Sequence, residues 1–137
     1  MLSLERVEVA IQGARILRGV DLELPAGGRL ALVGRNGAGK TTTMRAIMGL
    51  LPLSGGAIRF DGQDLARVPA HRRTALGIGY APEDRRLFPT FTVAENVRLP
   101  AELLGLSRDE IDARLARVFE LLPELRELAD RQAGALS

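Results

Sequence analysis

The sequence has no cysteine, no tryptophan and a single histidine among its 137 residues. The absence of cysteine excludes a disulfide framework, cysteine-based zinc and iron–sulfur sites, and a thiol nucleophile. One histidine leaves little for metal chemistry. A chain of this length still hides roughly two-thirds of its unfolded surface on folding, so it needs no covalent or metal cross-link to be stable. We therefore expect one ordinary globular domain.

The sequence also lacks an excess of either charge, and it has no long apolar run. The 19 basic and 17 acidic residues leave a formal net charge of +2, which indicates no nucleic-acid partner. No stretch approaches the roughly 18 apolar residues that a membrane-spanning helix needs. Residues 1–6 carry an acid instead of the apolar run of a signal peptide. We expect a cytoplasmic or peripheral protein.

Glycine, in contrast, is plentiful, because 15 glycines make up about 11% of the chain, against ~7% in average proteins. Three of them lie in one segment that fits the pattern G-x-x-x-x-G-K-[ST], namely Gly34-Arg35-Asn36-Gly37-Ala38-Gly39-Lys40-Thr41. An apolar run at residues 30–33 precedes this segment, and a helix from Lys40 to about Leu50 is expected after it. The phosphate-binding motif requires this strand–loop–helix context.

Each residue type in this segment has a physical reason. Glycines adopt positive φ and let successive amides converge on an anion, and the helix N-terminus adds its own amides and positive dipole end. Lys40 brings a full charge to the β- and γ-phosphates, the Thr41 hydroxyl can ligate Mg²⁺, and Thr42 is positioned to contact the nearer phosphates. The alternative is a glycine-rich turn that binds nothing, but the pattern arises by chance in well under about 1% of such chains. The sequence therefore predicts a nucleotide-binding P-loop.

The pattern of the first 90 residues predicts a mixed α/β core. Alternation over residues 2–24 indicates antiparallel strands with one buried face. The apolar runs at residues 30–33 and 78–81 are expected to be core strands, the first buried on both faces in a parallel sheet. Asp61-Gly62 predicts a tight hairpin after a strand at residues 57–60. Pro69 is expected at the first position of a helix over residues 69–76 that ends on Gly77.

The last third of the chain changes to helical patterns. Thr92 with Glu95, and Ser107 with Glu110, both fit the capping box, in which a hydroxyl and a carboxylate satisfy each other's backbone amides. Apolar residues at helical spacing follow the second box at Ile111, Leu115, Val118, Phe119 and Leu122. Two or three helices are therefore expected within residues 92–132.

Four segments in order are similar to the ATP-binding cassette (ABC) ATPases. Residues 32–42 resemble the Walker A loop of that family, residues 54–62 its "SG.I.FDG" hairpin, and residues 91–97 the "LTV.EN" start of its helical subdomain. Residues 133–137 resemble the approach to its Leu-Ser-Gly-Gly-Gln signature, with only the first two signature residues present. The resemblance implies an α/β P-loop NTPase (RecA-like) core with an antiparallel β-subdomain at about residues 1–90, and a helical subdomain at about 91–133.

A finer similarity lies at residues 80–89, which resemble the Q-loop of ATPases from high-affinity branched-chain amino acid importers. Most ABC ATPases carry Gln at the position of Glu83. The resemblance implies that Glu83 reaches towards Mg²⁺ and the attacking water, and that Lys40 and Glu83 act in catalysis with ATP and Mg²⁺ as cofactors. The other interpretation of Glu83 is a solvated loop acid.

The resemblance also implies partners and a place in the cell. The helices next to the Q-loop would meet membrane permease subunits, and a second ATPase subunit would complete a head-to-tail dimer. The protein would then lie peripherally on the cytoplasmic face of the inner (plasma) membrane. The transported cargo would be chosen by other subunits.

Three features depart from the family pattern or invite a wrong assignment. Ile11 falls where an aromatic residue usually stacks on adenine, so adenine selectivity is expected to be weakened several-fold, since such a stack is worth about 0.5–1.5 kcal/mol. His71 is expected to be a surface residue, because the switch histidine of the family would come later in the chain. The arginine groups are expected to form solvated faces, and they comprise Arg67, Arg72, Arg73, Arg85 and Arg86.

The similarity also places the Walker B Asp, the Glu that activates water and the switch His beyond Ser137. These 137 residues alone are therefore expected not to turn over ATP. A strand at residues 30–33 would have an unpaired edge and a bare face, so we expect self-association, strand exchange or a rearranged P-loop. Other interpretations are an ABC ATPase of another importer, of translation or of DNA repair, a P-loop kinase or GTPase, and a piece that only docks on partners.

Overall fold

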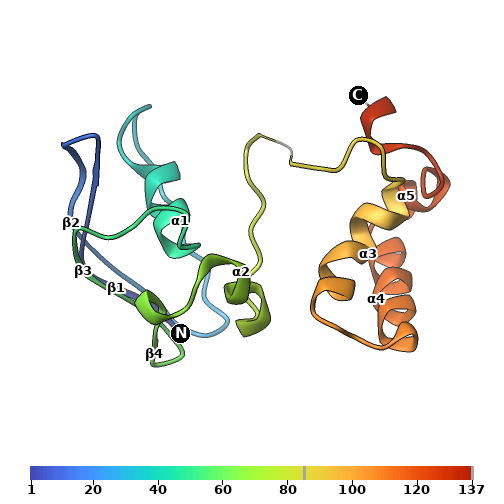
Figure 1. The fold of residues 1–137 in the computed structure, drawn as a ribbon, viewed down its shortest axis with the longest axis horizontal. Coiled ribbons are helices and arrows are strands. Elements are labelled where there is room, and N and C mark those ends of the chain that lie inside the picture. The colour runs from blue at the N-terminus through green and yellow to red at the C-terminus, as the bar shows by residue number, and fades with distance from the viewer. Residues whose placement is uncertain (85, 137) are drawn as a thin grey trace. The chain divides into compact units, whose positions relative to one another are not determined.

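The computed structural model describes residues 1–84 and 86–136 of the chain (Figure 1). Internal contacts divide it into two compact units, residues Met1–Tyr80 (unit 1) and Ala81–Ser137 (unit 2). Unit 1 holds a β-sheet and the glycine-rich loop, whereas unit 2 is helical. Each unit has its own contacts and is described in turn.

Unit 1 is built on a four-stranded sheet with the order β2-β1-β3-β4. Its strands are β1 (Leu2–Ile11), β2 (Ala14–Leu24), β3 (Gly55–Phe60) and β4 (Gln63–Asp64). All three pairings are antiparallel, as predicted for residues 2–24. Asp61 and Gly62 connect β3 to β4 with φ of 47° and 81°, the two positive values that a tight hairpin turn requires. The predicted hairpin is confirmed.

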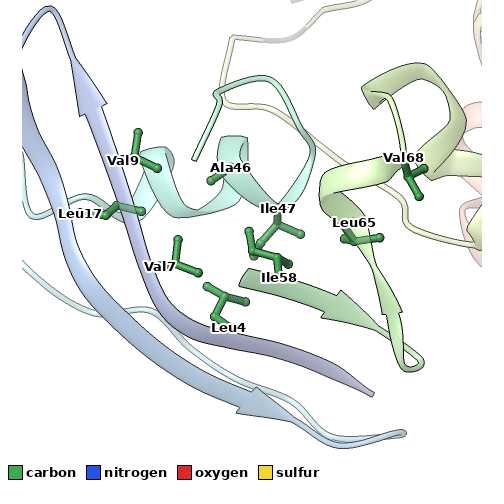
Figure 2. Packing of buried hydrophobic residues seen from close by; sticks show 9 residues of the cluster. All are labelled: Leu4, Val7, Val9, Leu17, Ala46, Ile47, Ile58, Leu65 and Val68. Atoms are coloured by element: carbon green, nitrogen blue, oxygen red, sulfur yellow. The ribbon is translucent and has the colours of Figure 1, made fainter. Parts of the chain in front are cut away.

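Helix α1 (Lys40–Ile47) covers this sheet and closes the core of unit 1 (Figure 2). It ends at Ile47, earlier than the expected Leu50, and Gly49 follows with φ of 69°. Apolar side chains from β1, β2, α1, β3 and the segment after β4 make one cluster. Its members are Leu4, Val7, Val9, Leu17, Ala46, Ile47, Ile58, Leu65 and Val68. The core of unit 1 therefore lies directly beside the helix that follows the glycine-rich loop.

Two predicted core strands are not formed. Residues 30–33 and 78–81 lie outside every strand, and no strand among the described residues pairs with them. Val33 is 91% exposed and Leu30 43% exposed. A strand is defined by hydrogen bonds to a neighbour, so an apolar run without a partner does not become one, whatever its propensity. The prediction of a bare apolar face at residues 30–33 is confirmed, whereas the predicted strands are wrong.

The segment after the hairpin forms short helices. They are the 3₁₀ turn η1 (Leu65–Arg67), α2 (Ala70–Arg73) and the 3₁₀ turn η2 (Thr74–Leu76). Pro69 is extended (φ −63°, ψ 151°) and precedes the helix as its N-cap, so its expected place inside the first turn is wrong. Gly77 ends the segment with φ of 88°, as predicted. His71 is exposed on α2, which confirms a surface position.

Arg73 corrects the prediction that these arginines form solvated faces. It is only 6% exposed, and its guanidinium donates hydrogen bonds to backbone carbonyls of four other residues. Arg67 and Arg72 are exposed as expected, and Arg86 is exposed with an ion pair to Asp84. Arg85 lies outside the described residues. The carbonyls around Arg73 come from separate segments, which local sequence patterns do not bring together.

Unit 2 contains the helices α3 (Val93–Leu103), α4 (Arg108–Leu121) and α5 (Pro123–Glu127), and the 3₁₀ turn η3 (Ala133–Ala135). Both predicted capping boxes are present, Thr92 with Glu95 at the start of α3 and Ser107 with Glu110 at the start of α4. On α4, Ile111 is buried and faces α3 beside a small cavity. Within the described part of the chain, no helix combines the length and apolar character needed to cross a bilayer.

The loop before α3 is held by hydrogen bonds to α3 and to η3. The Asn96 side chain accepts from the Phe88 amide (2.9 Å) and donates to the carbonyls of Phe88 (3.0 Å) and Thr92 (2.9 Å). The rings of Phe88 and Phe91 stack with centroids 5.2 Å apart. The Ala133 amide donates to the Phe91 carbonyl at 2.9 Å, so η3 is held against the same loop.

Candidate functional site

The glycine-rich segment of unit 1 forms a tight loop that ends in α1. Gly37 and Gly39 have φ of 82° and 92°, a region that L side chains rarely adopt. The Ala38 amide donates to the Arg35 carbonyl at 3.1 Å and closes a turn between them. A Cβ on Gly37 would meet nothing within 4 Å, so backbone conformation rather than crowding requires glycine there. The structure brings residues 34–42 together in one loop and one helix start.

Lys40, the only lysine of the chain, points its ammonium back into this loop. Its Nζ donates to the carbonyl oxygen of Gly34 at 2.7 Å and to that of Arg35 at 2.9 Å. An ammonium group has three donors, so two carbonyl partners leave a third for another acceptor. The loop carbonyls thus hold a full positive charge at the N-terminal end of α1.

The first turn of α1 presents backbone amides beside that charge. Gly39 is the N-cap in the left-handed conformation and has no side chain to cap the helix. The amides of Lys40, Thr41 and Thr42 have no carbonyl one turn earlier within the helix, as at any helix start. Thr41 is exposed and Thr42 half-buried. These amides, the helix dipole and the lysine together favour an anion at one place.

Two contacts beneath the loop were not foreseen from the sequence. A Cβ on Gly39 would lie 2.7 Å from Cδ2 of Leu17. The backbone of Gly39 therefore packs closely against the Leu17 side chain, which comes from β2. The Thr43 hydroxyl donates to the Gly39 carbonyl at 2.9 Å and is buried. A Ser or Thr hydroxyl in a helix commonly donates to the carbonyl four residues earlier, so the sequence does carry a signal for the bond from Thr43 to Gly39. The Leu17 contact joins distant segments and has no local signal.

Glu83 and Ile11, two other residues singled out from the sequence, are both exposed. Glu83 is exposed in a turn of unit 2, whereas the glycine-rich loop belongs to unit 1. Ile11 ends β1 and is 38% exposed, so an apolar surface is available at the position predicted for adenine. Arg35, Asn36 and Ala38 are exposed on the loop.

The residues present are of the types that bind a phosphate group. The loop offers glycines with positive φ and one lysine, the start of α1 adds its first amides, and Thr41 adds a hydroxyl of the kind that ligates Mg²⁺ beside phosphates. Within residues 1–84 and 86–136, no group of three or more His, Asp or Glu side chains is arranged to hold a metal ion.

Comparison with known proteins decides the family. A family model described as "ABC transporter" matches residues 17–137. The chain belongs to the ABC transporter family. A solved structure described as the ATP binding subunit of an ABC transporter has a TM-score of 0.85 and 29% identity, covering 100% of this chain and 56% of that one. The fold is therefore that of the α/β P-loop domain of ABC ATPases, with its antiparallel sheet and its helical part.

Relatives in the ABC transporter family carry names with different cargoes. A probable branched-chain amino acid transport ATP-binding protein, LivF of Archaeoglobus fulgidus, is 33% identical over 137 residues, covering 100% of this chain and 57% of LivF. The Fe(3+) ions import ATP-binding protein FbpC of Streptomyces coelicolor is 37% identical over 137 residues, covering 100% and 38%. The chain thus spans little more than half the length of LivF and less of FbpC.

Proposed function

We propose that this chain is the nucleotide-binding part of an energy-coupling ATPase subunit of an ABC importer. The observation that carries the proposal is the Lys40 ammonium, held at 2.7 Å and 2.9 Å by two loop carbonyls at the start of α1. That geometry supplies a fixed cation and free amides where the phosphates of ATP would bind. Membership of the ABC transporter family supports ATP as the nucleotide.

In this proposal the loop residues Gly34, Arg35, Asn36, Gly37, Ala38 and Gly39 surround the phosphates with backbone amides. Lys40 binds the β- and γ-phosphates, and its positive charge offsets the negative charge that develops during phosphoryl transfer. The Thr41 hydroxyl ligates Mg²⁺, and Thr42 contacts the nearer phosphates. Magnesium, when bound, would offset the negative charge of the phosphates.

Glu83 is proposed to act from the Q-loop as a second ligand towards Mg²⁺ and the attacking water. Its exposure in a turn leaves the carboxylate accessible to a ligand. We propose that the chain consists of a β-subdomain with the P-loop core at about residues 1–90 and a helical subdomain at about 91–133. The Q-loop that carries Glu83 connects the two. The helical part would meet membrane permease subunits on the cytoplasmic face of the inner membrane, and a second ATPase subunit would pair head to tail.

Branched-chain amino acids are the cargo that we propose. The residues Pro82, Glu83, Phe88 and Pro89 resemble the Q-loop of those importers, and LivF is among the relatives. FbpC, whose name specifies Fe(3+) import, supports iron as the second candidate. Uptake of labelled leucine and of labelled Fe(3+) by cells that lack the gene separates the two. Loss of leucine uptake alone supports the first cargo, and loss of iron uptake alone contradicts it.

Titration calorimetry with Mg-ATP tests nucleotide binding directly. Wild type is expected to bind, and Lys40→Ala to lose most of the affinity, because the phosphates lose their charged donor. Arg45→Ala is the matched control, since Arg45 is an exposed cation on the last turn of the same helix. Equal affinity for wild type and Lys40→Ala contradicts the proposal, as does the absence of binding by wild type.

Hydrolysis gives a separate test. We expect the 137-residue chain to release no phosphate from ATP, because the resemblance places the water-activating Glu outside it. Release of phosphate is measured with purified protein, and Lys40→Ala identifies any contaminating ATPase. A rate that remains through purification and disappears in Lys40→Ala contradicts this expectation.

A further inference from the structure

Arg73 is the one charged side chain that is buried among the described residues of the chain. Its Nε donates to the Val68 carbonyl at 3.0 Å, and its Nη2 donates to the Leu65 carbonyl at 2.7 Å. Its Nη1 donates to the carbonyl of Ala46 at 3.2 Å and to that of Ile47. A single guanidinium therefore joins the end of α1 to both sides of η1.

The four carbonyls belong to residues whose side chains build the core. Ala46, Ile47, Leu65 and Val68 are all members of the apolar cluster drawn in Figure 2. Their side chains fix these backbones against the sheet, and Arg73 binds the same backbones through their polar groups. The guanidinium is consequently set in a rigid frame, and its position in turn fixes the spacing between α1 and η1.

Gly49 makes this approach possible. A Cβ at Gly49 would lie 2.7 Å from both Cζ and Nη2 of Arg73, closer than real Cβ contacts. Gly49 also has φ of 69° immediately after the end of α1. The turn after the helix is therefore shaped to admit the guanidinium, and any larger residue at Gly49 would displace it.

The end of α1 that Arg73 binds is close to the phosphate-binding end of the same helix. The eight residues of α1 span only about 12 Å at the helical rise of 1.5 Å per residue. The last carbonyls of a helix lack partners within it and carry its negative dipole end, so a cation there is favourable. With only about two turns at 3.6 residues per turn, α1 has little length over which to absorb a shift at Ile47 before it reaches Lys40 and Thr41.

We propose that Arg73 is a positioning residue for the phosphate site, which it holds in place by binding the C-terminal carbonyls of α1. This inference rests on the proposed nucleotide-binding function. Arg73 does not touch the ligand in this proposal, because it acts through α1. An arginine that only added stability would change the midpoint of unfolding and leave the affinity of the folded protein for nucleotide unchanged.

The experiment compares wild type, Arg73→Ala, Arg73→Lys and the control Arg72→Ala, whose side chain is exposed next to Arg73 on α2. Mg-ATP affinity is measured by calorimetry at a temperature where urea unfolding curves show each variant folded. Because Lys40 is the only lysine, selective isotope labelling of lysine gives one side-chain NMR signal in wild type, Arg73→Ala and Arg72→Ala. Arg73→Lys gives two signals, and the one that disappears when Lys40→Ala is added to this variant is that of Lys40. That signal reports the environment of the Nζ atom without nucleotide.

Arg73→Ala is expected to bind Mg-ATP about tenfold more weakly, a loss of ~1.4 kcal/mol of binding free energy. Its Lys40 signal is expected to shift, whereas Arg72→Ala matches wild type in both measurements. Arg73→Lys keeps the charge but has too few donors, in the wrong geometry, for four carbonyls, so an intermediate loss is expected.

Chemical rescue separates positioning from loss of packing. Arg73 lines a cavity of about 360 Å³ with Ala46, Gly49 and Leu65, which provides space for a free guanidinium ion. Low millimolar guanidinium chloride is expected to restore affinity and the Lys40 signal in Arg73→Ala, whereas equal sodium chloride does not. Lys40→Ala is expected to show no rescue.

Wild-type affinity and an unchanged Lys40 signal in folded Arg73→Ala overturn the inference. If Arg73→Ala does not fold, the same two results in Arg73→Lys overturn it. Failure of wild type to bind Mg-ATP is a different outcome, because it contradicts the proposed function. In that case a Lys40 signal that is the same in wild type and Arg73→Lys still overturns the positioning of Lys40 by Arg73.

Discussion

The amide of Gly134 donates a 3.0 Å hydrogen bond to the carbonyl oxygen of Pro89, which joins η3 to the loop before α3. A Cβ on Gly134 would lie 2.9 Å from Cβ of Pro89 and 3.0 Å from its carbonyl oxygen. Both atoms belong to rigid groups, since one is in the proline ring and the other in the backbone. The contact therefore requires glycine for lack of space.

The first prediction concerns this contact. Gly134→Ala is expected to lower the free energy of unfolding of unit 2 by about 1–3 kcal/mol, because the backbone must move to admit a methyl group. Urea unfolding followed by circular dichroism measures the change. Gly79→Ala is the control, because a Cβ there meets nothing within 4 Å and no positive φ is involved. Equal effects of the two substitutions contradict the argument.

The second prediction is a pH dependence at the start of α4. Hydrogen bonds from the hydroxyl and then the amide of Ser107 lower the pKa of Glu110 below its ordinary value of 4.5. The folded state thus favours the carboxylate, so its contribution to stability is present above pH 4.5 and is lost as the pH falls through the lowered pKa.

Unfolding curves of wild type and Glu110→Gln across this range measure the effect. The difference in unfolding free energy between them is expected to shrink as the pH falls below 4.5. In Ser107→Ala the carboxylate loses its hydroxyl donor, and Glu110→Gln in that background should show a smaller pH-dependent difference. A difference that stays constant with pH in wild type contradicts the prediction.

The third prediction concerns Asn96, whose side chain holds the loop before α3. Asn96→Asp keeps an acceptor for the Phe88 amide but loses the donor to the Phe88 and Thr92 carbonyls and places a negative charge beside them. We expect a loss of about 1 kcal/mol in unfolding free energy, the usual net value of a hydrogen bond, because the Asn96 side chain no longer donates to these partly exposed carbonyls. Asn96→Ala removes the bonds without adding charge and is expected to cost less. Urea unfolding measures both variants. A smaller loss of unfolding free energy in Asn96→Asp than in Asn96→Ala contradicts the prediction.

The fourth prediction follows from the exposed apolar residues at positions 30 and 33. Leu30 and Val33 are 43% and 91% exposed, and no strand among the described residues pairs with this segment. We expect the chain to self-associate through it, and Val33→Lys to reduce association, because a charge opposes pairing of strand edges. Light scattering over a range of concentrations measures the assembly state. Leu103→Lys is the control, since Leu103 is 79% exposed on α3 in unit 2. A compact wild-type monomer at high concentration contradicts the prediction.

Much of the local structure could be read from the sequence because its causes are local. The capping boxes at Thr92 and Ser107, the turn at Asp61 and Gly62, and the end of η2 at Gly77 each depend on neighbouring residues. The helix after the glycine-rich loop was placed correctly at its start. Its end was expected too late, because Gly49 ends the helix by a turn that Arg73 stabilises.

The sequence by itself determined the glycine-rich loop that leads into α1, since glycine conformation, a helix start and one lysine are properties of consecutive residues. The tertiary structure decided what distant segments do to one another. It left residues 30–33 without a strand partner, it placed Gly39 on Leu17, and it buried Arg73 among four carbonyls. Strand pairing and burial depend on partners far away in the chain, so hydrophobicity and charge alone do not specify them.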